Sequence, residues 1–277
     1  ARALLAELER FHAQRGEAYD AALQTNNIGL AWFYEARFEP ALKYFKAAEA
    51  AFQRLQETQR VAVALQNAAL CEWGLGRLTA ALPMFDRALA LMGPQPYPDL
   101  YLVTLSSSAL AHYAAGRFDD SLHLNGQAID LATRLQMDRA RARGYYGMGV
   151  TYYAIGDRVL ATRFLHSALE IWSPDVDARG RVAALRALAV IEHEQGEYAK
   201  AAEHHSEALR LATAPSARSR ILLRLAADYA AQGDTATARN LLDSLAAFPP
   251  NGDRLVQALA LTQRSRLARE SGALDAA

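Results

Sequence analysis

The sequence predicts an all-α fold in which antiparallel helix pairs stack into a right-handed solenoid. Two observations support this prediction: a small turn residue recurs at a nearly constant spacing, and other residue types keep fixed positions around it. The turn residues are Ala36, Gly76, Gly116, Gly156, Gly196 and Gly233, spaced 40 residues apart except for a last step of 37. Such a period is typical of repeat proteins in which each unit packs against its neighbours.

Small residues at helical spacing surround each turn. They occupy three positions of the repeat: seven before the turn, five after it and twelve after it. These residues are Gly29, Ala69, Ala109, Gly149, Ala189 and Ala226; Ala41, Ala81, Ser121, Ala161, Ala201 and Ala238; and Ala48, Ala88, Ala128, Ala168, Ala208 and, as the exception, Leu245. Because helices approach closely only where side chains are short, each repeat is predicted to be a tight helix pair.

Bulkier apolar residues lie two and nine residues after the turn. They include Phe38, Leu78, Phe118 and Tyr198 at the first position, and Phe45, Phe85, Leu165 and Leu242 at the second. We expect them to fill the core space that the small residues leave.

The order of these residues resembles the tetratricopeptide repeat, in which Gly or Ala, aromatic residues and a turn follow one another in fixed phase. The first copy shows it best, with Ile28-Gly29-x-x-Trp32 followed by Phe38, Ala41, Phe45 and Ala48. The resemblance extends over nearly the whole chain and implies a superhelix of about six full repeats. The usual repeat has about 34 residues, so a period of 40 requires helices longer by about one turn, or longer linkers.

The repeats are expected at residues 22–57, 61–94, 101–136, 140–173, 180–213 and 218–248. Several linkers between them contain proline, which lacks an amide hydrogen and ends a helix. These linkers are Gly93 to Pro98, Ser173-Pro174, Ala214-Pro215 and Pro249 to Gly252. None is long enough to separate domains, so residues 1–277 are predicted to form one elongated domain.

Both ends of the sequence fall inside a repeat. Ala1, Leu5 and Leu8 fit the second helix of a preceding copy, and Ala273 to Ala277 begin the second helix of a seventh copy after Gly272. The pattern therefore predicts half repeats at both ends of a piece of a longer protein.

Composition and charge narrow the classes of protein. The 30 basic and 30 acidic residues give a formal net charge of zero, so no bulk field attracts nucleic acid. No stretch has a membrane-spanning length without charges, and no signal peptide is visible. The single cysteine, Cys71, excludes an internal disulfide and suits a reducing, cytoplasmic compartment. The predominance of arginine over lysine, together with abundant alanine, indicates a bacterial source with GC-rich DNA.

Aromatic rings recur three residues before the turns. In a stack of helix pairs, the first helix of each pair lines the concave wall. On that helix the core-facing residues include the small residue seven before the turn, and the residues one position further along the chain form a stripe that is expected to face the groove. That stripe carries Phe33, Trp73, Tyr113, Tyr153 and His193 at equivalent positions. Such rings suit an extended or helical peptide. The alternative is that they pack against the next repeat, as the apolar residues on the same stripe suggest: Leu30, Leu70, Leu110, Val150 and Val190.

Polar groups on the same wall differ between early and late repeats. The early ones can pair with a peptide backbone, as their family counterparts often do, or simply face solvent; they include Asn26, Asn27, Asn67 and Ser106. The late arginines favour carboxylates or phosphates, although charged runs are usually solvated faces. The predicted peptide-binding groove consists of the aromatic column, the early polar residues and five late residues. The late residues are Arg143, Tyr146, Arg186, Arg220 and Arg224.

No catalytic or metal-binding pattern is visible. The histidines share no repeat position and form no metal-spaced pair with a carboxylate on one helix face; they are His12, His112, His123, His166, His193, His204 and His205. His204 and His205 are adjacent, so their side chains point about 100° apart on a helix. Cys71 is interpreted as a small buried hydrophobe. We expect a non-enzymatic protein without cofactor or metal.

The leading functional hypothesis is a protein-interaction scaffold or sensor that captures a peptide or partner segment in its groove. A nucleic-acid-binding solenoid is a further class, favoured by the late arginines and opposed by the zero net charge.

A resemblance gives another interpretation. Arrays with a period near 40 are similar to regulatory arms of bacterial multidomain proteins, either those with a CHAT (caspase-like) peptidase domain or signal-responsive transcription activators with maltose-regulator-like arms. The segments Arg254 to Ala260 and Ser265 to Gly272 are similar to the run leading out of such arrays. This resemblance implies an autoinhibitory or ligand-sensing arm, with a peptidase or DNA-binding effector domain outside the sequence.

Overall fold

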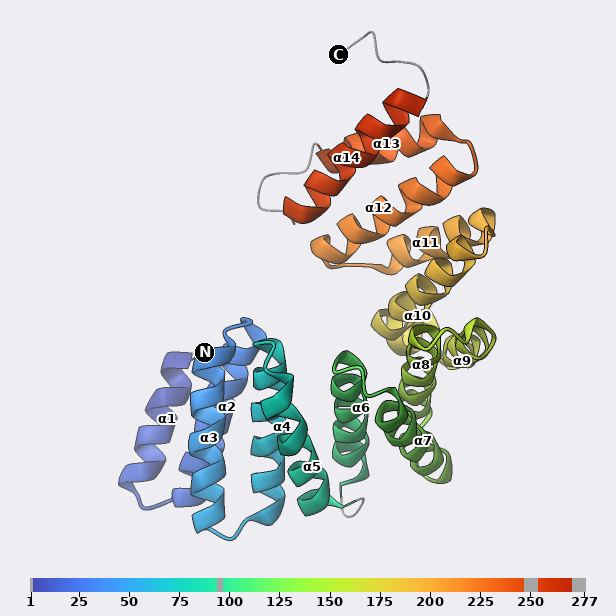
Figure 1. Cartoon of the computed structure of the whole chain (residues 1–277). Helices are drawn as coiled ribbons and strands as arrows, with labels where there is room; N and C mark the ends of the chain where they lie inside the picture. Colours follow the sequence, from blue (N-terminus) through green and yellow to red (C-terminus); the bar gives the residue numbers. More distant parts are fainter. Residues whose placement is uncertain (1, 94–96, 247–253, 271–277) are drawn as a thin grey trace. The chain divides into compact units, whose positions relative to one another are not determined.

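The computed structural model describes residues 2–93, 97–246 and 254–270, and these residues form helices without any strand (Figure 1). The helices are α1 (Arg2–Gln14), α2 (Ala18–Tyr34), α3 (Phe38–Arg54), α4 (Thr58–Gly74), α5 (Leu78–Met92), α6 (Pro98–Ala114), α7 (Phe118–Arg134), α8 (Asp138–Ala154), α9 (Arg158–Ile171), α10 (Pro174–Glu194), α11 (Tyr198–Leu211), α12 (Pro215–Ala231), α13 (Thr235–Ala246) and α14 (Arg254–Glu270). The prediction of an all-α helical-repeat solenoid is confirmed.

The chain divides into two compact units, Ala1–Gly147 and Met148–Ala277, which are described separately. The boundary falls within α8. One continuous domain therefore stays a prediction. The residues expected to begin a seventh copy, Ala273 to Ala277, and the linker residues Pro94 to Pro96 and Pro249 to Gly252 lie outside the described part of the chain.

Helix length explains the 40-residue period. The helices α2, α3, α4, α6 and α7 each contain 17 residues. Three-residue links join α2 to α3 at residues 35–37 and α3 to α4 at residues 55–57. Two such helices and two such links account for the full period, so longer helices, rather than longer linkers, distinguish these repeats. The first helices begin two to six residues before the repeat starts expected from the sequence.

The predicted turn residues take the left-handed backbone conformation that ends a helix. Ala36 and the five turn glycines have φ between +56° and +91°. The amide that follows each of them returns to the helix, as where Arg77 N donates to Glu72 O over 2.8 Å. This closing bond satisfies a carbonyl at the helix end. Glycine adopts the conformation without a Cβ clash, whereas Ala36 must accommodate its methyl group at φ +56°.

The small-residue positions form the core predicted from the sequence. Every residue at the three small positions is buried. At Gly29 an added Cβ would lie 2.7 Å from the Phe45 ring, and at Gly149 it would lie 2.7 Å from Leu165. The residue seven before the turn therefore packs directly on the bulky residue nine after it, which closes the helix pair.

Two repeats place a polar side chain at that bulky core position. Asn125 is 2% exposed and His205 is 1% exposed, where the other repeats have phenylalanine or leucine. The Nδ2 of Asn125 donates to the Ser121 carbonyl over 2.9 Å. The space beside it is left by Gly147, since a Cβ there would collide with the Asn125 amide. His205 has different partners, described below.

No helix within the described ranges is long and apolar enough to cross a membrane. Cys71 is fully buried on α4, and burial, assisted by Glu72, raises the pKa of its thiol to about 12. It therefore behaves as the small buried hydrophobe that the sequence predicted.

Candidate functional site

In the first unit, three first helices present a row of partly exposed apolar residues. The helices α2, α4 and α6 contact one another in order (Figure 1). Leu30, Phe33, Leu70, Trp73, Leu110 and Tyr113 lie at equivalent positions of these helices and are not fully buried. We call this row the α2–α4–α6 face. Its most open member is Leu110, with 38% of its surface exposed, and Val103 on the same helix is 37% exposed.

Each aromatic ring of the predicted column also packs against a neighbour. The ring of Phe33 lies 5.5 Å from that of Phe38, between centroids, and Tyr113 lies 6.0 Å from Phe118. Trp73 packs in the same apolar cluster as Leu78. One side of each ring thus stabilises the helix pair, while another part remains exposed. The role of these rings in a peptide-binding groove stays a prediction.

The late members of the column have polar neighbours. The Tyr153 hydroxyl donates to Glu194, which also accepts from Arg158 Nη2 over 3.0 Å. Burial, followed by the bond to Glu194, raises the pKa of Tyr153. His193 lies edge-on to Tyr198, with ring centroids 5.1 Å apart. Phe33, Trp73 and Tyr113 belong to the first unit and these two residues to the second, so a continuous column remains a prediction.

The early polar residues differ in their exposure. Asn26 is only 9% exposed, and its Oδ1 accepts from Asn67 Nδ2 over 3.3 Å. The Ser106 hydroxyl donates to the Leu102 carbonyl of its own helix over 2.9 Å. Asn27 is exposed and contacts Gln24. Of these four predicted groove residues, Asn27 has the most open side chain.

The predicted basic residues divide between the units. Arg143 and Tyr146 are half-buried on the part of α8 that belongs to the first unit, and Arg186 is half-buried on α10. Arg220 and Arg224 are exposed on α12. Arg224 lines a cavity together with His193. Because Arg143 belongs to the first unit and the other late arginines to the second, a shared basic site stays a prediction.

A buried carboxylate joins two histidines in the second unit. Asp228 on α12 is 1% exposed. Its Oδ1 lies 2.7 Å from His193 Nδ1 on α10, and its Oδ2 lies 2.6 Å from His205 Nδ1 on α11. A carboxylate oxygen can only accept, so each Nδ1 carries the donated proton. Three helices thus contribute one residue each to this cluster.

Sequence spacing did not predict this cluster, because its three residues lie on three different helices and spacing relates side chains on one helix. A signal was nevertheless present. His205 occupies a bulky core position, and Asp228 lies five residues before its turn, where other repeats carry the buried residues Cys71, Ala111 and Ile191. Most repeats have apolar residues at these two positions, and Asn125 and Thr151 are the other polar ones. A buried polar residue there indicates a specific partner.

A second histidine–carboxylate pair joins α10 and α11. The Nδ1 of His204 lies 2.7 Å from Oε2 of Glu192, which is 8% exposed. This hydrogen bond raises the pKa of His204. His204 and His205 therefore point to different carboxylates, in agreement with the divergence expected for adjacent residues on a helix.

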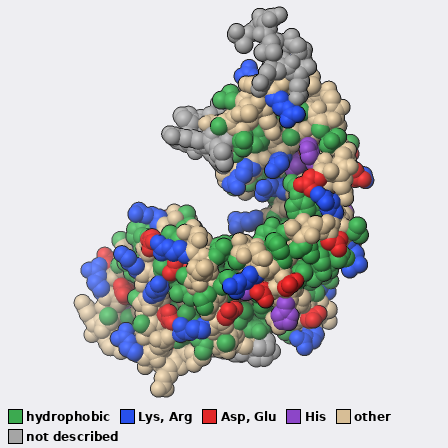
Figure 2. All heavy atoms as spheres, viewed as in Figure 1, with side chains coloured by type: hydrophobic (Ala, Val, Ile, Leu, Met, Phe, Trp, Pro, Cys, Tyr) green, Lys and Arg blue, Asp and Glu red, His purple; other side chains and the backbone are tan. Residues whose placement is uncertain are grey.

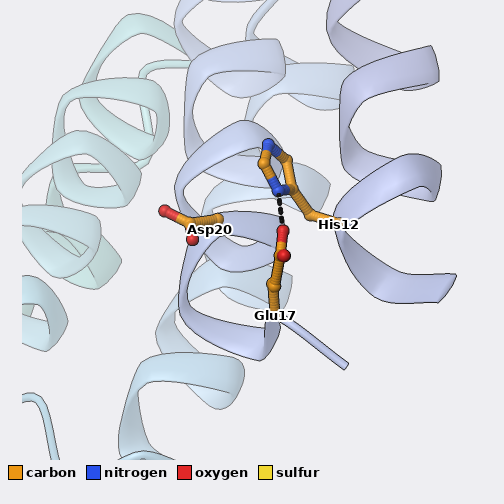
Figure 3. Close-up of side chains that lie close together, drawn as sticks. All are labelled: His12, Glu17 and Asp20. Atoms are coloured by element: carbon orange, nitrogen blue, oxygen red, sulfur yellow. Dashed lines mark hydrogen bonds and ion pairs between the residues drawn. The ribbon is translucent and has the colours of Figure 1, made fainter. Parts of the chain in front are cut away.

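A third group of titratable side chains lies where α1 meets α2 (Figure 3). The ligand atoms of His12, Glu17 and Asp20 lie within 4.8 Å of one another. His12 Nδ1 is 2.6 Å from Glu17 Oε2, and Arg15 Nε donates to Glu17 Oε1 over 2.8 Å. The bonds from His12 and Arg15 lower the pKa of Glu17. Both carboxylate oxygens of Glu17 are therefore hydrogen-bonded at the start of α2. This group links α1 to α2, and the sequence spacing did not predict it.

Comparison with known proteins gives a family match over part of the chain and a fold. Residues 141–214 match the tetratricopeptide repeat family. No match was found among curated proteins.

Several solved structures share the fold. The apo form of the quorum sensor NprR from B. thuringiensis has a TM-score of 0.67 and 15% identity, covering 94% of this chain and 76% of that chain. BtubC (BKLC) from P. vanneervenii has a TM-score of 0.66 and 17% identity, covering 77% and 94% respectively. A Rap protein complexed with competence and sporulation factor has a TM-score of 0.61 and 18% identity, covering 93% and 70%. At these identities the likeness establishes the fold alone.

Proposed function

We propose that this chain is a non-catalytic scaffold that holds a segment of a partner protein on the α2–α4–α6 face. Residues 141–214 match the tetratricopeptide repeat family, and the described residues form an all-α repeat fold. The observation that supports this function is the partial exposure of equivalent apolar residues on three adjacent first helices. Tetratricopeptide repeats are generally interaction modules, which agrees with this assignment.

The exposed row has the chemistry of a peptide-binding surface. The residues directly before Leu30, Leu70 and Leu110 are buried; they are Gly29, Ala69 and Ala109. The row therefore lies at the edge of the buried core. Burying apolar surface contributes about 25 cal/mol per Å². Aromatic rings add a large contact area at a small cost in side-chain entropy. A partner segment with apolar side chains at regular spacing would remove this row from water.

Two of the similar structures support the same kind of role. One is a Rap protein solved in complex with competence and sporulation factor, and another is described as a quorum sensor. The fold thus occurs in a quorum sensor and in a protein solved with a bound factor. An extended or helical peptide is the ligand we propose for this chain.

The test is selection of random peptides on the purified protein, followed by measurement of Kd for the selected sequences. We expect Trp73→Ala and Leu110→Ala each to weaken binding about tenfold or more, a loss of about 1.4 kcal/mol or greater. Leu91→Ala is the matched control, because Leu91 is 37% exposed on α5, outside the row. Circular dichroism checks that the helices remain intact.

Two outcomes would count against this function: failure to select any peptide, or selected peptides that bind the two row variants as tightly as the wild type. The regulatory arm of a peptidase or DNA-binding protein, the cytoplasmic compartment and the nucleic-acid-binding solenoid stay predictions from the sequence.

A further inference from the structure

The turn between α1 and α2 brings one imidazole and two carboxylates together. His12 lies in the last turn of α1, Glu17 directly precedes α2, and Asp20 lies in the first turn of α2 (Figure 3). One ligand atom from each side chain lies within 4.8 Å of the other two. Within the described ranges, no other three histidine, cysteine or carboxylate side chains meet in this way.

The main chain fixes the spacing of these three side chains. Gly16 has φ +74°, and the amide of Glu17 donates to the carbonyl of His12 over 3.0 Å. The amide of Ala21 then donates to the carbonyl of Glu17 over 3.0 Å at the start of α2, and Asp20 lies about one helical turn after Glu17. Because the backbone has already arranged these side chains, binding a ligand between them requires little further ordering.

Equivalent links of the first unit have the same backbone bond but lack this set of side chains. In the link before α4, the amide of Glu57 donates to the carbonyl of Phe52 over 3.0 Å. Phe52 is a buried ring at the position of His12, and Arg60 takes the position of Asp20. The link before α8 has no histidine or carboxylate at any of the three positions. The turn thus forms without this set, so the fold alone does not explain its presence in the first link.

Asp20 lacks a partner, whereas both oxygens of Glu17 have one. Asp20 is half-buried and makes no hydrogen bond or ion pair with the described part of the chain. Figure 2 shows acidic and basic side chains mixed on the visible surface of the first unit, so no extended field of one sign dominates there. The group itself contains two carboxylates and, through Arg15, one guanidinium. A further positive charge is therefore favoured at this turn.

We infer that His12, Glu17 and Asp20 bind one divalent transition-metal ion of the Zn²⁺ class. His12 Nδ1 supplies a nitrogen ligand, each carboxylate supplies an oxygen, and water completes the coordination. Binding replaces the hydrogen bond between His12 and Glu17, and the proton of Nδ1 passes to solvent. Ligand atoms of a tetrahedral Zn²⁺ lie about 3.4 Å apart, which falls between the 2.6 Å of the His12–Glu17 pair and the 4.8 Å limit of the group. Side-chain shifts of about 1 Å therefore complete the site.

The ion joins α1 to α2. No described residue of α1 is buried, so side-chain burial alone holds this helix weakly. Ligands on both sides of the turn close the link between the two helices when the ion binds. The inference goes beyond the proposed function, since none of its residues belongs to the α2–α4–α6 face, and it differs from the expectation of a protein without metal.

The experiment titrates the full chain, free of any affinity tag, with Zn²⁺, Ca²⁺ and Mg²⁺ and measures binding by calorimetry. We expect one Zn²⁺ per chain, bound at least about tenfold more tightly than Ca²⁺ or Mg²⁺, because an imidazole ligand favours transition metals. Hydrogen exchange in α1 and in the first turn of α2 should slow when Zn²⁺ is bound. The inference is overturned if Zn²⁺ does not bind at about 100 μM, or if Ca²⁺ binds as tightly as Zn²⁺.

Single substitutions locate the ion. His12→Phe, which introduces the side chain found at the equivalent Phe52, and Asp20→Asn are each expected to weaken Zn²⁺ binding about tenfold or more. Arg15→Gln removes a competing positive charge and should strengthen binding severalfold. His166→Gln is the matched control, because it removes an exposed imidazole of α9 and should leave the affinity unchanged. Unchanged affinity in both His12→Phe and Asp20→Asn, or an equal loss in His166→Gln, would place the ion elsewhere and overturn the inference.

A pair of variants separates this inference from the proposed function. Trp73→Ala is expected to leave the Zn²⁺ affinity unchanged, and Asp20→Asn is expected to leave the binding of selected peptides unchanged. Loss of peptide binding at the α2–α4–α6 face and loss of Zn²⁺ binding at the first turn are therefore distinguishable.

Discussion

At the scale of single residues, the turns determine where each helix pair folds back. All six turn residues have positive φ, but only Ala36 does so with a side chain. An L-residue in this conformation is disfavoured by about 1 kcal/mol or more, because its Cβ approaches the backbone. At Gly116 an added Cβ would meet nothing within 4 Å, so the backbone alone sets the cost of a substitution there.

Opposite effects on stability are therefore expected at two equivalent turns. Gly116→Ala should lower the free energy of unfolding by about 1 kcal/mol, and Ala36→Gly should raise it by about 0.5 kcal/mol. The smaller gain reflects the extra entropy that glycine gives to the unfolded chain. Urea unfolding followed by circular dichroism measures both. An equal effect of the same sign would show that the backbone conformation does not control stability at these turns.

At the scale of helices, the contacts between α10 and α11 combine alanine packing with a buried acid–histidine pair. Ala189 and Ala201 are both fully buried in this helix pair. His204 Nδ1 lies 2.7 Å from Glu192 beside this core, and the hydrogen bond raises the pKa of His204 from its usual value of 6.5. Protonated His204 is thus more stable in the folded than in the unfolded protein.

This shift predicts a pH dependence with a definite sign. The contribution of His204 is fully present below about pH 6.5, the usual pKa, and is lost as the pH rises through the raised pKa of the folded protein. His204→Gln should therefore lower the free energy of unfolding by about 1 kcal/mol at about pH 5.5, and by less at about pH 9.

The comparison needs a histidine that lacks such a partner. His166→Gln, at an exposed position of α9, serves as the control, because it removes an imidazole from the same unit. Parallel stability–pH curves for wild type and His204→Gln would contradict the assignment.

At the scale of the whole molecule, the described contacts between helices within each unit are local along the chain. The helix contacts described above join neighbours in sequence or next neighbours, such as α2 with α4 and α12 with α14. Repeat proteins of this kind derive their stability from single repeats and the interfaces between adjacent ones. A defect in one repeat is therefore expected to remain within its neighbourhood.

A core truncation tests this locality. Phe85→Ala removes a fully buried ring of α5 and should cost about 3–5 kcal/mol of local stability. Hydrogen exchange followed by mass spectrometry should show faster exchange in α4, α5 and α6, with amides of α10 to α12 nearly unchanged. Equal acceleration in all helices would indicate one cooperative unit instead.

The repeat pattern predicted the fold because its determinants recur in sequence. The regular spacing of the turn residues located the turns. The small residues at fixed distances from each turn identified the core, as the packing of Gly29 against Phe45 illustrates. The repeat boundaries were less accurate, since the first helices begin before the apolar positions that define them. The proposed binding residues stay a prediction, and their exposure was not predictable from spacing, since Asn26 is only 9% exposed whereas the adjacent Asn27 is exposed.

The sequence by itself therefore determined the helical repeat, its turns and its packing positions, because each depends on residues a fixed number of steps apart along one helix or one turn. Only the tertiary structure decided that Asp228 would lie between His193 and His205, and that Arg224 and Arg266 would share a cavity. These contacts join side chains from different helices. They depend on the distance and angle between packed helices, which local spacing does not specify.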